Sequence, residues 1–204
     1  MKTERAGQAA ELDLFVLRHA ATEWNAQKRF QGRRDIPLSE EGRISLQGKR
    51  LPSEFRSIPW FVSPLQRAQQ TAQELGITEY ITPAALIEMD WGDWEGERLP
   101  DLRKQLGSSM QDQESRGLDL QPPGGESPRQ VRQRVLQWLA DTPFTTAQAG
   151  IISHKGVIRA MLSAALDWEM RDKCPLKVRW DEALRFRWSD GRLTLVDYNI
   201  PLSD

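Results

Sequence analysis

The chain of 204 residues is poor in the side chains that bind metals or form cross-links: it has one cysteine, Cys174, and two histidines, His19 and His154. A single cysteine excludes an internal disulfide and favours a reducing, cytoplasmic setting. The sequence has no apolar run of about 18 residues, so it predicts no membrane span. Residues 1–11 are polar and lack the apolar core of a signal peptide. We interpret them as a loose lead-in.

A charge excess is also lacking, because 28 Lys and Arg residues oppose 29 Asp and Glu residues for a net charge of −1. This balance argues against a broad nucleic-acid or membrane surface, so an anion site must be a local cluster of cations. The acidic segment 88–96 has closely spaced carboxylates but no nearby histidine and no calcium-loop spacing. We therefore predict neither a metal nor a cofactor.

Three short apolar runs stand out, and each ends in polar or cationic residues. The run Leu14–Leu17 is followed by Arg18 and His19, the run 59–62 by Ser63, and the run 149–153 by His154. Runs of this kind indicate buried strands, and ligands of an open α/β sheet lie beyond the carboxyl ends of its strands. Both histidines of the chain are thus expected at the edge of the sheet where a ligand binds.

The remaining pattern predicts one α/β domain over residues 1–204, with no linker to a second domain. We expect three layers, in which a mostly parallel central sheet is flanked by helices on both faces. The expected elements are strands at 13–18, 59–62, 79–82 and 149–153, helices at 39–50, 65–75, 99–116, 127–140 and 157–166, and a hairpin of 184–188 with 193–195. Ser63 is expected to cap the helix at 65–75, and Ser127 with Gln130 to form a capping box.

Two arginines give this edge its chemistry. Arg18 follows the first strand directly, and Arg67 falls in the first turn of a helix, where free backbone N–H groups already favour an anion. An arginine binds phosphate through paired, charge-assisted hydrogen bonds, and an imidazole can act as a nucleophile. Taken singly, each side chain could equally be a surface ion-pair residue or a helix-cap histidine. Their shared position at strand ends favours a phosphate site.

The segment Leu17-Arg18-His19-Ala20-Ala21-Thr22 resembles the R-H-G-x-T signature of the histidine phosphatase superfamily, in its phosphoglycerate mutase-like branch. The resemblance spans residues 14–160, with its motifs in order. It continues through Asn25, Gln31-Gly32, Asp35 with Pro37-Leu38, 63–72, Glu88 with 92–96, 125–127 and 153–159. It departs from the family at Ala20-Ala21, where Gly-Glu is usual, and this leaves the fine tuning of His19 open.

The resemblance implies a role for each residue of the candidate site. His19 would be the nucleophile that takes the phosphoryl group, which Arg18, Arg67 and His154 would bind. Glu88 would give a proton to the leaving oxygen, with the acidic neighbours Asp90, Asp93 and Glu95 as alternates. The residues implied to bind substrate are Thr22, Asn25, Gln31 and the backbone of Gly32.

Several functions remain open at this point. The first is a metal-independent phosphomonoesterase that hydrolyses a small phosphorylated metabolite through a phosphohistidine. The alternatives are a phosphoglycerate mutase, a more specific enzyme such as an α-ribazole phosphatase, or a binding domain with an inactive site. The resemblance implies a longer lid in the family's mutases than the span from Glu95 to Glu126 provides, and this span has no basic cluster. Both features favour hydrolysis over mutase chemistry. The sequence leaves the natural substrate and the oligomeric state open.

Overall fold

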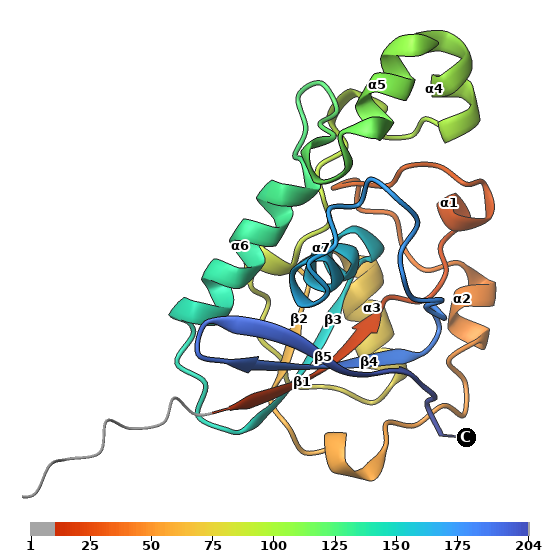
Figure 1. The fold of residues 1–204 in the computed structure, drawn as a ribbon. Coiled ribbons are helices and arrows are strands. Elements are labelled where there is room, and N and C mark those ends of the chain that lie inside the picture. Colours follow the sequence, from red (N-terminus) through yellow and green to blue (C-terminus); the bar gives the residue numbers. More distant parts are fainter. Residues whose placement is uncertain (1–10, 204) are drawn as a thin grey trace, which may run out of the picture.

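The computed structural model describes residues 11–203, so the expected lead-in lies outside the described residues except for Glu11. A five-stranded sheet in the order β2-β3-β1-β4-β5 forms the centre of the fold (Figure 1). Strands β1, β2 and β3 run parallel, and β4 and β5 form the antiparallel hairpin. The strands are β1 (Leu12–Arg18), β2 (Trp60–Val62), β3 (Gln148–Ser153), β4 (Ala183–Ser189) and β5 (Arg192–Ile200).

Helices cover both faces of the sheet, which confirms the three-layer prediction. The helices are α1 (Glu23–Ala26), α2 (Glu40–Ile44), α3 (Gln66–Glu74), α4 (Leu99–Leu106), α5 (Ser108–Ser115), α6 (Pro128–Asp141) and α7 (Lys155–Ala165). Leu14 and Val16 of β1 face a core built with α6 and α7, whereas Phe15 and Leu17 face a core shared with α3. Because β1 is buried on both faces, its sequence is continuously apolar rather than alternating.

Helices α4 and α5 lie away from the two main cores, beyond the carboxyl ends of the parallel strands (Figure 1). They have their own small apolar cluster, in which Leu102 and Met110 pack with Trp94. We refer to residues 99–120 as the cap. The expected single helix at 99–116 is interrupted at Gly107, whose φ of 55° is unfavourable for other residues.

Two further expectations differ from the structure. The helix expected at 39–50 ends at Ile44, because Leu46, Gln47 and Lys49 donate to carbonyls three residues back and form tight turns instead. The strand expected at 79–82 is reduced to one bridge between Ile81 and Phe61. Pro83 lacks a backbone donor and therefore cannot extend this pairing.

The register of the parallel strands aligns their carboxyl ends. Arg18 of β1 pairs with Ser153 of β3, and Val62 of β2 pairs with Ile152. The pairing continues past the strands, since His19 N–H donates to the Ser153 carbonyl over 2.9 Å. The two histidines therefore lie side by side, as the sequence predicts.

In the part of the chain from 11 to 203, no helix combines the length and the apolar character needed to cross a membrane.

Replacement of Gly150 by alanine should destabilise the sheet. A methyl group at Gly150 would lie 2.4 Å from ring atoms of Trp60 on the neighbouring strand. Overpacking of this kind costs about 1–3 kcal/mol, and we expect urea unfolding to show it. The same substitution in a Trp60→Leu background should cost less, because the ring is gone. Equal costs in the two backgrounds would contradict this explanation.

Candidate active site

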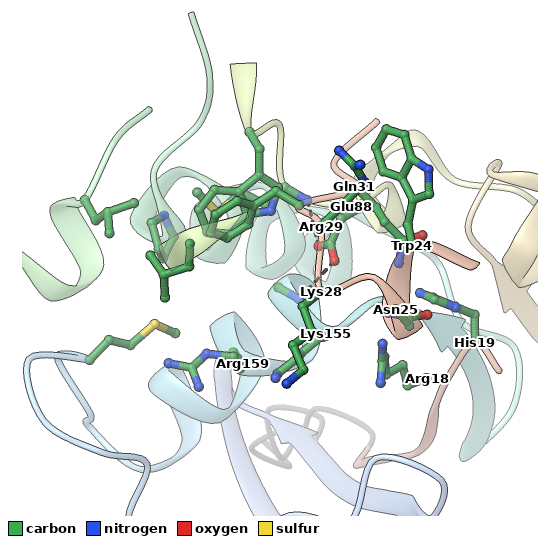
Figure 2. A pocket seen from close by; sticks show the side chains of 18 of the residues that line it. Arg18, His19, Trp24, Asn25, Lys28, Arg29, Gln31, Glu88, Lys155 and Arg159 are labelled. Atoms are coloured by element: carbon green, nitrogen blue, oxygen red, sulfur yellow. Dashed lines mark hydrogen bonds between the residues drawn. The ribbon is translucent and has the colours of Figure 1, made fainter. Parts of the chain in front are cut away.

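The three parallel strands end at a cavity of about 600 Å³ (Figure 2). Arg18 and His19 line it from the end of β1, Arg67 from the start of α3, and Glu88 from the loop before residue 90. Of the other side chains expected to bind substrate, Asn25 and Gln31 also line the cavity. The sequence-predicted residues are thus largely brought together at one place.

The hydrogen bonds of His19 fix its tautomer. Its Nδ1 lies 2.7 Å from the carbonyl oxygen of Ala20, which can only accept, so Nδ1 has the proton and Nε2 has a free lone pair. Burial, and then the cations Arg18 and Arg67, hold the pKa of His19 well below its usual 6.5. The imidazole is therefore neutral at neutral pH, which is the form that attacks phosphorus.

Arg67 is fully buried and binds three groups from different parts of the chain. Its terminal nitrogens donate to the carbonyls of Gly32 and Arg34, each over 2.8 Å, and its Nε donates to His154 Nδ1 over 3.2 Å. Each terminal nitrogen keeps a second N–H for which the described residues provide no acceptor. Two charged donors thus remain for an oxyanion.

His154 lies against His19, with ring centroids 5.0 Å apart. It accepts from Arg67 at Nδ1, so its Nε2 has the proton and donates to Ser63 Oγ over 2.6 Å. Burial and then Arg67 hold its pKa well below the usual 6.5. Ser63 is therefore not the helix cap that we expected: α3 begins at Gln66, so Leu65 occupies the cap position without a side-chain cap. Ser63 Oγ instead accepts from the backbone N–H of Leu65 over 3.3 Å as well as from His154.

Two buried polar atoms at the cavity have no hydrogen-bond partner among the described residues. They are Nε of Arg18 and Oε1 of Gln31. A buried charged donor without an acceptor is costly, and an anion in the cavity would satisfy it. Arg18 also lies over the ring of Trp180, with 6.0 Å from its guanidinium carbon to the centroid. This contact holds the cation without neutralising it.

The residues after His19 are placed by a capping box at the start of α1. Asn25 Oδ1 accepts from the backbone N–H and the hydroxyl of Thr22, over 2.9 and 3.1 Å. The Asn25 amide nitrogen therefore remains for the cavity, whereas Thr22 is almost fully buried and acts as the cap. Gly32 gives its carbonyl to Arg67. Thr22 and Gly32 thus support the site from behind its wall.

Glu88 also lines the cavity and is 8% exposed. Its carboxylate accepts from the backbone N–H of Met89 over 2.8 Å and of Gly156 over 3.2 Å. Burial raises its pKa above the usual 4.5, although these hydrogen bonds and Arg67 oppose the rise. A carboxyl group with a raised pKa is suited to donate a proton.

The alternate acids are engaged elsewhere. Asp90 lies 3.3 Å from Arg33 in an ion pair and also accepts from Gly92 N–H over 2.8 Å. Glu95 accepts from the backbone N–H of Arg33 over 2.7 Å. Neither lines the cavity, and neither does Asp93. The structure therefore favours Glu88 as the acid.

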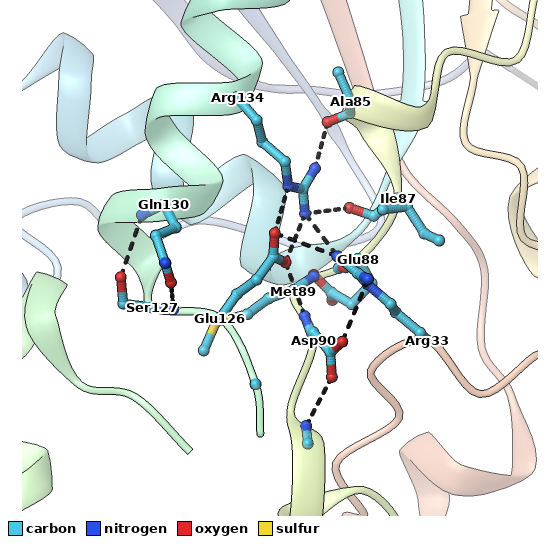
Figure 3. Close-up of polar contacts among 12 residues, drawn as sticks. Arg33, Ala85, Ile87, Glu88, Met89, Asp90, Glu126, Ser127, Gln130 and Arg134 are labelled. Carbon is cyan, nitrogen blue, oxygen red and sulfur yellow. Dashed lines mark hydrogen bonds and ion pairs between the residues drawn. The ribbon is translucent and has the colours of Figure 1, made fainter. Parts of the chain in front are cut away.

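An arginine outside the cavity holds the Glu88 loop in place (Figure 3). Arg134 of α6 donates to the backbone carbonyls of Ala85, Ile87 and Glu88. It also forms an ion pair with Glu126 over 3.1 Å. Burial by itself would raise the pKa of the Glu126 carboxyl, but the contacts with Arg134 outweigh this effect, and the pKa lies below its usual value. The position of Glu88 thus depends on contacts made from α6.

Sequence reasoning missed two parts of the cavity wall. Lys155 and Arg159 line it from α7, and their spacing of four residues on one helix face could have been noticed. The apolar part comes from the cap and its neighbours, which no local pattern connects with the site. Its residues are Phe30, Trp91, Leu99, Met110, Leu120 and Met170.

Within residues 11–203, no three His, Cys, Asp or Glu side chains gather closely enough to hold a metal ion.

Comparisons with known proteins agree with this geometry. The family model of the histidine phosphatase superfamily, branch 1, matches residues 14–201. A 2,3-bisphosphoglycerate-dependent phosphoglycerate mutase of Mesorhizobium japonicum is 31% identical over 164 residues, covering 74% of this chain and 80% of the mutase.

Two solved structures share the fold over nearly their whole length. The native mycobacterial glucosyl-3-phosphoglycerate phosphatase has a TM-score of 0.73 at 25% identity, covering 93% of this chain and 99% of that one. The α-ribazole phosphatase of Shigella flexneri has a TM-score of 0.74 at 21% identity, covering 95% of this chain and 100% of that one.

Replacement of Arg134 by methionine should both destabilise the protein and impair the placement of Glu88. It removes the Arg134 side-chain donor from the carbonyls of the Glu88 loop, and it leaves the largely buried Glu126 carboxylate with only Asp90 N–H and Arg33 as partners among the described residues. We expect a loss of about 2–4 kcal/mol in urea unfolding. The exposed Arg192→Met variant is the matched control and should unfold like the parent. Unchanged stability of Arg134→Met would refute this role.

Proposed function

We propose that this chain, which belongs to the histidine phosphatase superfamily, branch 1, is a phosphomonoesterase that hydrolyses a small phosphorylated metabolite without a metal. The observation that carries the proposal is the state of His19. Its Nδ1–H donates to the Ala20 carbonyl, which leaves Nε2 unprotonated, and its pKa is well below the usual value. His19 lines the cavity together with Arg18 and Arg67.

The first step forms the phosphohistidine. Arg18 and the two remaining N–H groups of Arg67 bind the phosphoryl oxygens and offset the charge that develops on them. His19 Nε2 attacks phosphorus while the bond to the ester oxygen breaks. Glu88 in its acid form gives its proton to that oxygen, so the alcohol leaves neutral.

The second step releases phosphate. A water molecule attacks the phosphorus of the phosphohistidine, the P–N bond breaks, and Nε2 regains its lone pair. The Glu88 carboxylate accepts the proton of the water and returns to its acid form. No electron transfer and no further reactant is needed, so hydrolysis of the ester balances.

His154 acts in this scheme chiefly on Arg67 and His19. It fixes the guanidinium through its Nδ1 and lies 5.0 Å, centroid to centroid, from the nucleophile. A direct bond from its Nε2–H to phosphate would require release of the Ser63 hydroxyl. The phosphate-binding role that the family resemblance implies for His154 remains a prediction.

Mutase chemistry is the second candidate, because named relatives near 31% identity are phosphoglycerate mutases. Hydrolysis is favoured by the short segment between Glu95 and Glu126 and by the nearly full-length match to phosphatase structures. Incubation with isotopically labelled phosphoglycerate and a trace of the bisphosphate distinguishes the two. A phosphatase releases phosphate, whereas a mutase moves the label between hydroxyl groups.

We propose the cytoplasm as the setting, because a single cysteine suits a reducing compartment. The near-neutral net charge of −1 supports a small-molecule substrate rather than a nucleic acid or a membrane.

Rapid alkaline quench during turnover should place a phosphoryl group on His19 and not on His154. Nε2 of His19 is unprotonated, whereas Nε2 of His154 donates to Ser63. His19→Ala should abolish both label and turnover, and His154→Ala should slow turnover while any label stays on His19. Mass spectrometry of samples prepared with a chelator is the measurement. Label on His154, or turnover that disappears with the chelator, would overturn the mechanism.

Glu88→Gln should slow the first turnover of an alkyl phosphate by about 10²–10⁴-fold and that of p-nitrophenyl phosphate much less. An alkoxide needs a proton to leave, whereas p-nitrophenolate hardly does. The reactive enzyme has neutral His19 and protonated Glu88, so the parent's alkyl phosphate rate should fall at low pH as His19 is protonated. It should also fall at high pH as Glu88, whose pKa is raised, ionises.

The variant should lose the fall at high pH and keep the fall at low pH. Rapid-quench measurements across the pH range give both effects. Equal slowing of the two esters would assign Glu88 a structural role.

A further inference from the structure

The cavity has more positive charge than one phosphate requires. Its lining includes the acids Glu88 and Glu114, and Glu114 is bound to Arg103 outside the cavity. The cations that line it are Arg18, Lys28, Arg29, Arg67, Lys155 and Arg159. A single phosphoryl group is already served by Arg18 and Arg67 in the mechanism above. Lys155 and Arg159 therefore lack a function in that scheme.

Arg159 is a half-buried arginine without a carboxylate partner among the described residues. Its guanidinium carbon lies 4.8 Å from the ring centroid of Trp168. That ring is 8% exposed and is fixed by a hydrogen bond from its indole N–H to the Asp172 carbonyl, over 3.2 Å. The nearby Glu169 is bound to Arg129 over 2.9 Å. The guanidinium is thus held in place by a ring face while its donors stay available.

Lys155 lies one helical turn earlier; it is exposed, and it also contacts a tryptophan ring. Its Nζ lies 5.1 Å from the ring centroid of Trp180, the ring that Arg18 also contacts. No carboxylate within residues 11–203 forms an ion pair with Lys155. The desolvation argument applies to Arg159, which is partly buried: a partly buried structural cation is normally paired with an acid, because an unpaired charge there is costly. Two neighbouring cations held only by tryptophan rings instead indicate a site for an external anion.

The two side chains extend the phosphate site in one direction. Residues four apart on a helix lie about 6 Å apart along its axis. Figure 2 shows Lys155 between Arg18 and Arg159, so the cations form a row that leads away from His19 along α7. An anionic group bound by this row would belong to the same molecule whose phosphate lies at His19.

We propose that Lys155 and Arg159 form a second anion subsite, so that the preferred substrate has a further carboxylate or phosphate a few bonds from the scissile ester. The proposal rests on the proposed function, because it assumes that phosphate binds at Arg18 and His19. A carboxylate and a second phosphate share the chemistry that guanidinium and ammonium groups recognise. The experiment below separates these two sources.

The test measures binding of phosphonates, which cannot be hydrolysed, to the full chain by calorimetry. Three ligands share one carbon chain: propylphosphonate, the same molecule with a terminal carboxylate, and the same molecule with a second phosphonate. For the parent protein, we expect a terminal anion to tighten binding about tenfold, as charge-assisted hydrogen bonds do. The tighter of the two anionic ligands identifies the source that the subsite prefers.

The double variant Lys155→Gln/Arg159→Gln should reduce this gain to about twofold or less, whatever happens to the binding of propylphosphonate itself. The control is Lys173→Gln/Arg192→Gln, which removes the same charge from exposed positions that do not line the cavity. It should keep the parent's gain. Ligands of equal affinity in the parent, or an unchanged gain in the Lys155/Arg159 variant, would overturn the subsite.

Failure of the proposed function gives a different result. In that case, the parent would hydrolyse neither p-nitrophenyl phosphate nor an alkyl phosphate, and propylphosphonate would not compete with orthophosphate for the cavity. A parent protein that hydrolyses these esters but binds the three phosphonates with equal affinity would refute the subsite alone. Calorimetry and the phosphatase assay therefore report on the two proposals separately.

Discussion

Burial of the Arg67 guanidinium is the constraint on which the site depends. A charged group of this size is stable in a protein interior only when most of its donors are satisfied, and here three acceptors come from the loop at 32–34 and from His154. One side chain of α3 thereby fixes a loop between β1 and α2 and the junction between β3 and α7. The same charge helps to keep both histidines neutral, so the support of the site and the state of its nucleophile have a common origin.

The groups for the two halves of the proposed reaction come from different layers. His19 stands at the end of a strand that is buried on both faces, and its backbone is paired with β3. Glu88 stands in a loop that has no strand pairing at that residue and is held by Arg134 of α6. The proposed nucleophile thus follows a central strand, the proposed acid stands on a loop held by side-chain hydrogen bonds, and both line the cavity. This separation also explains why the acid depends on a contact far from it in the sequence.

Charge is distributed within the cavity in a way that overall composition conceals. The chain is nearly neutral, yet the β1 and α7 side of the cavity is cationic and the cap side is apolar. Tryptophan rings hold Arg18, Lys155 and Arg159 without neutralising them. Of the two carboxylates that line the cavity, Glu114 is bound to Arg103, and Glu88 accepts from backbone N–H groups. The result is a local excess of free cationic donors, which is the property that an anionic substrate requires.

The sequence by itself determined the strands at the centre of the fold, the hairpin, the positions of His19 and His154 at strand ends, and that of Arg67 in the first turn of a helix, because apolar runs and capping residues are local signals. It mistook Ser63 for a cap, extended a helix past Ile44 and expected a strand around Ile81. Only the tertiary structure decided that the Ser63 hydroxyl binds His154, that Glu88 rather than Asp90 lines the cavity, and that Lys155 and Arg159 have no acidic partner within residues 11–203. These features depend on which distant side chains supply hydrogen bonds and charge, and that is fixed by packing between layers rather than by neighbours in the chain.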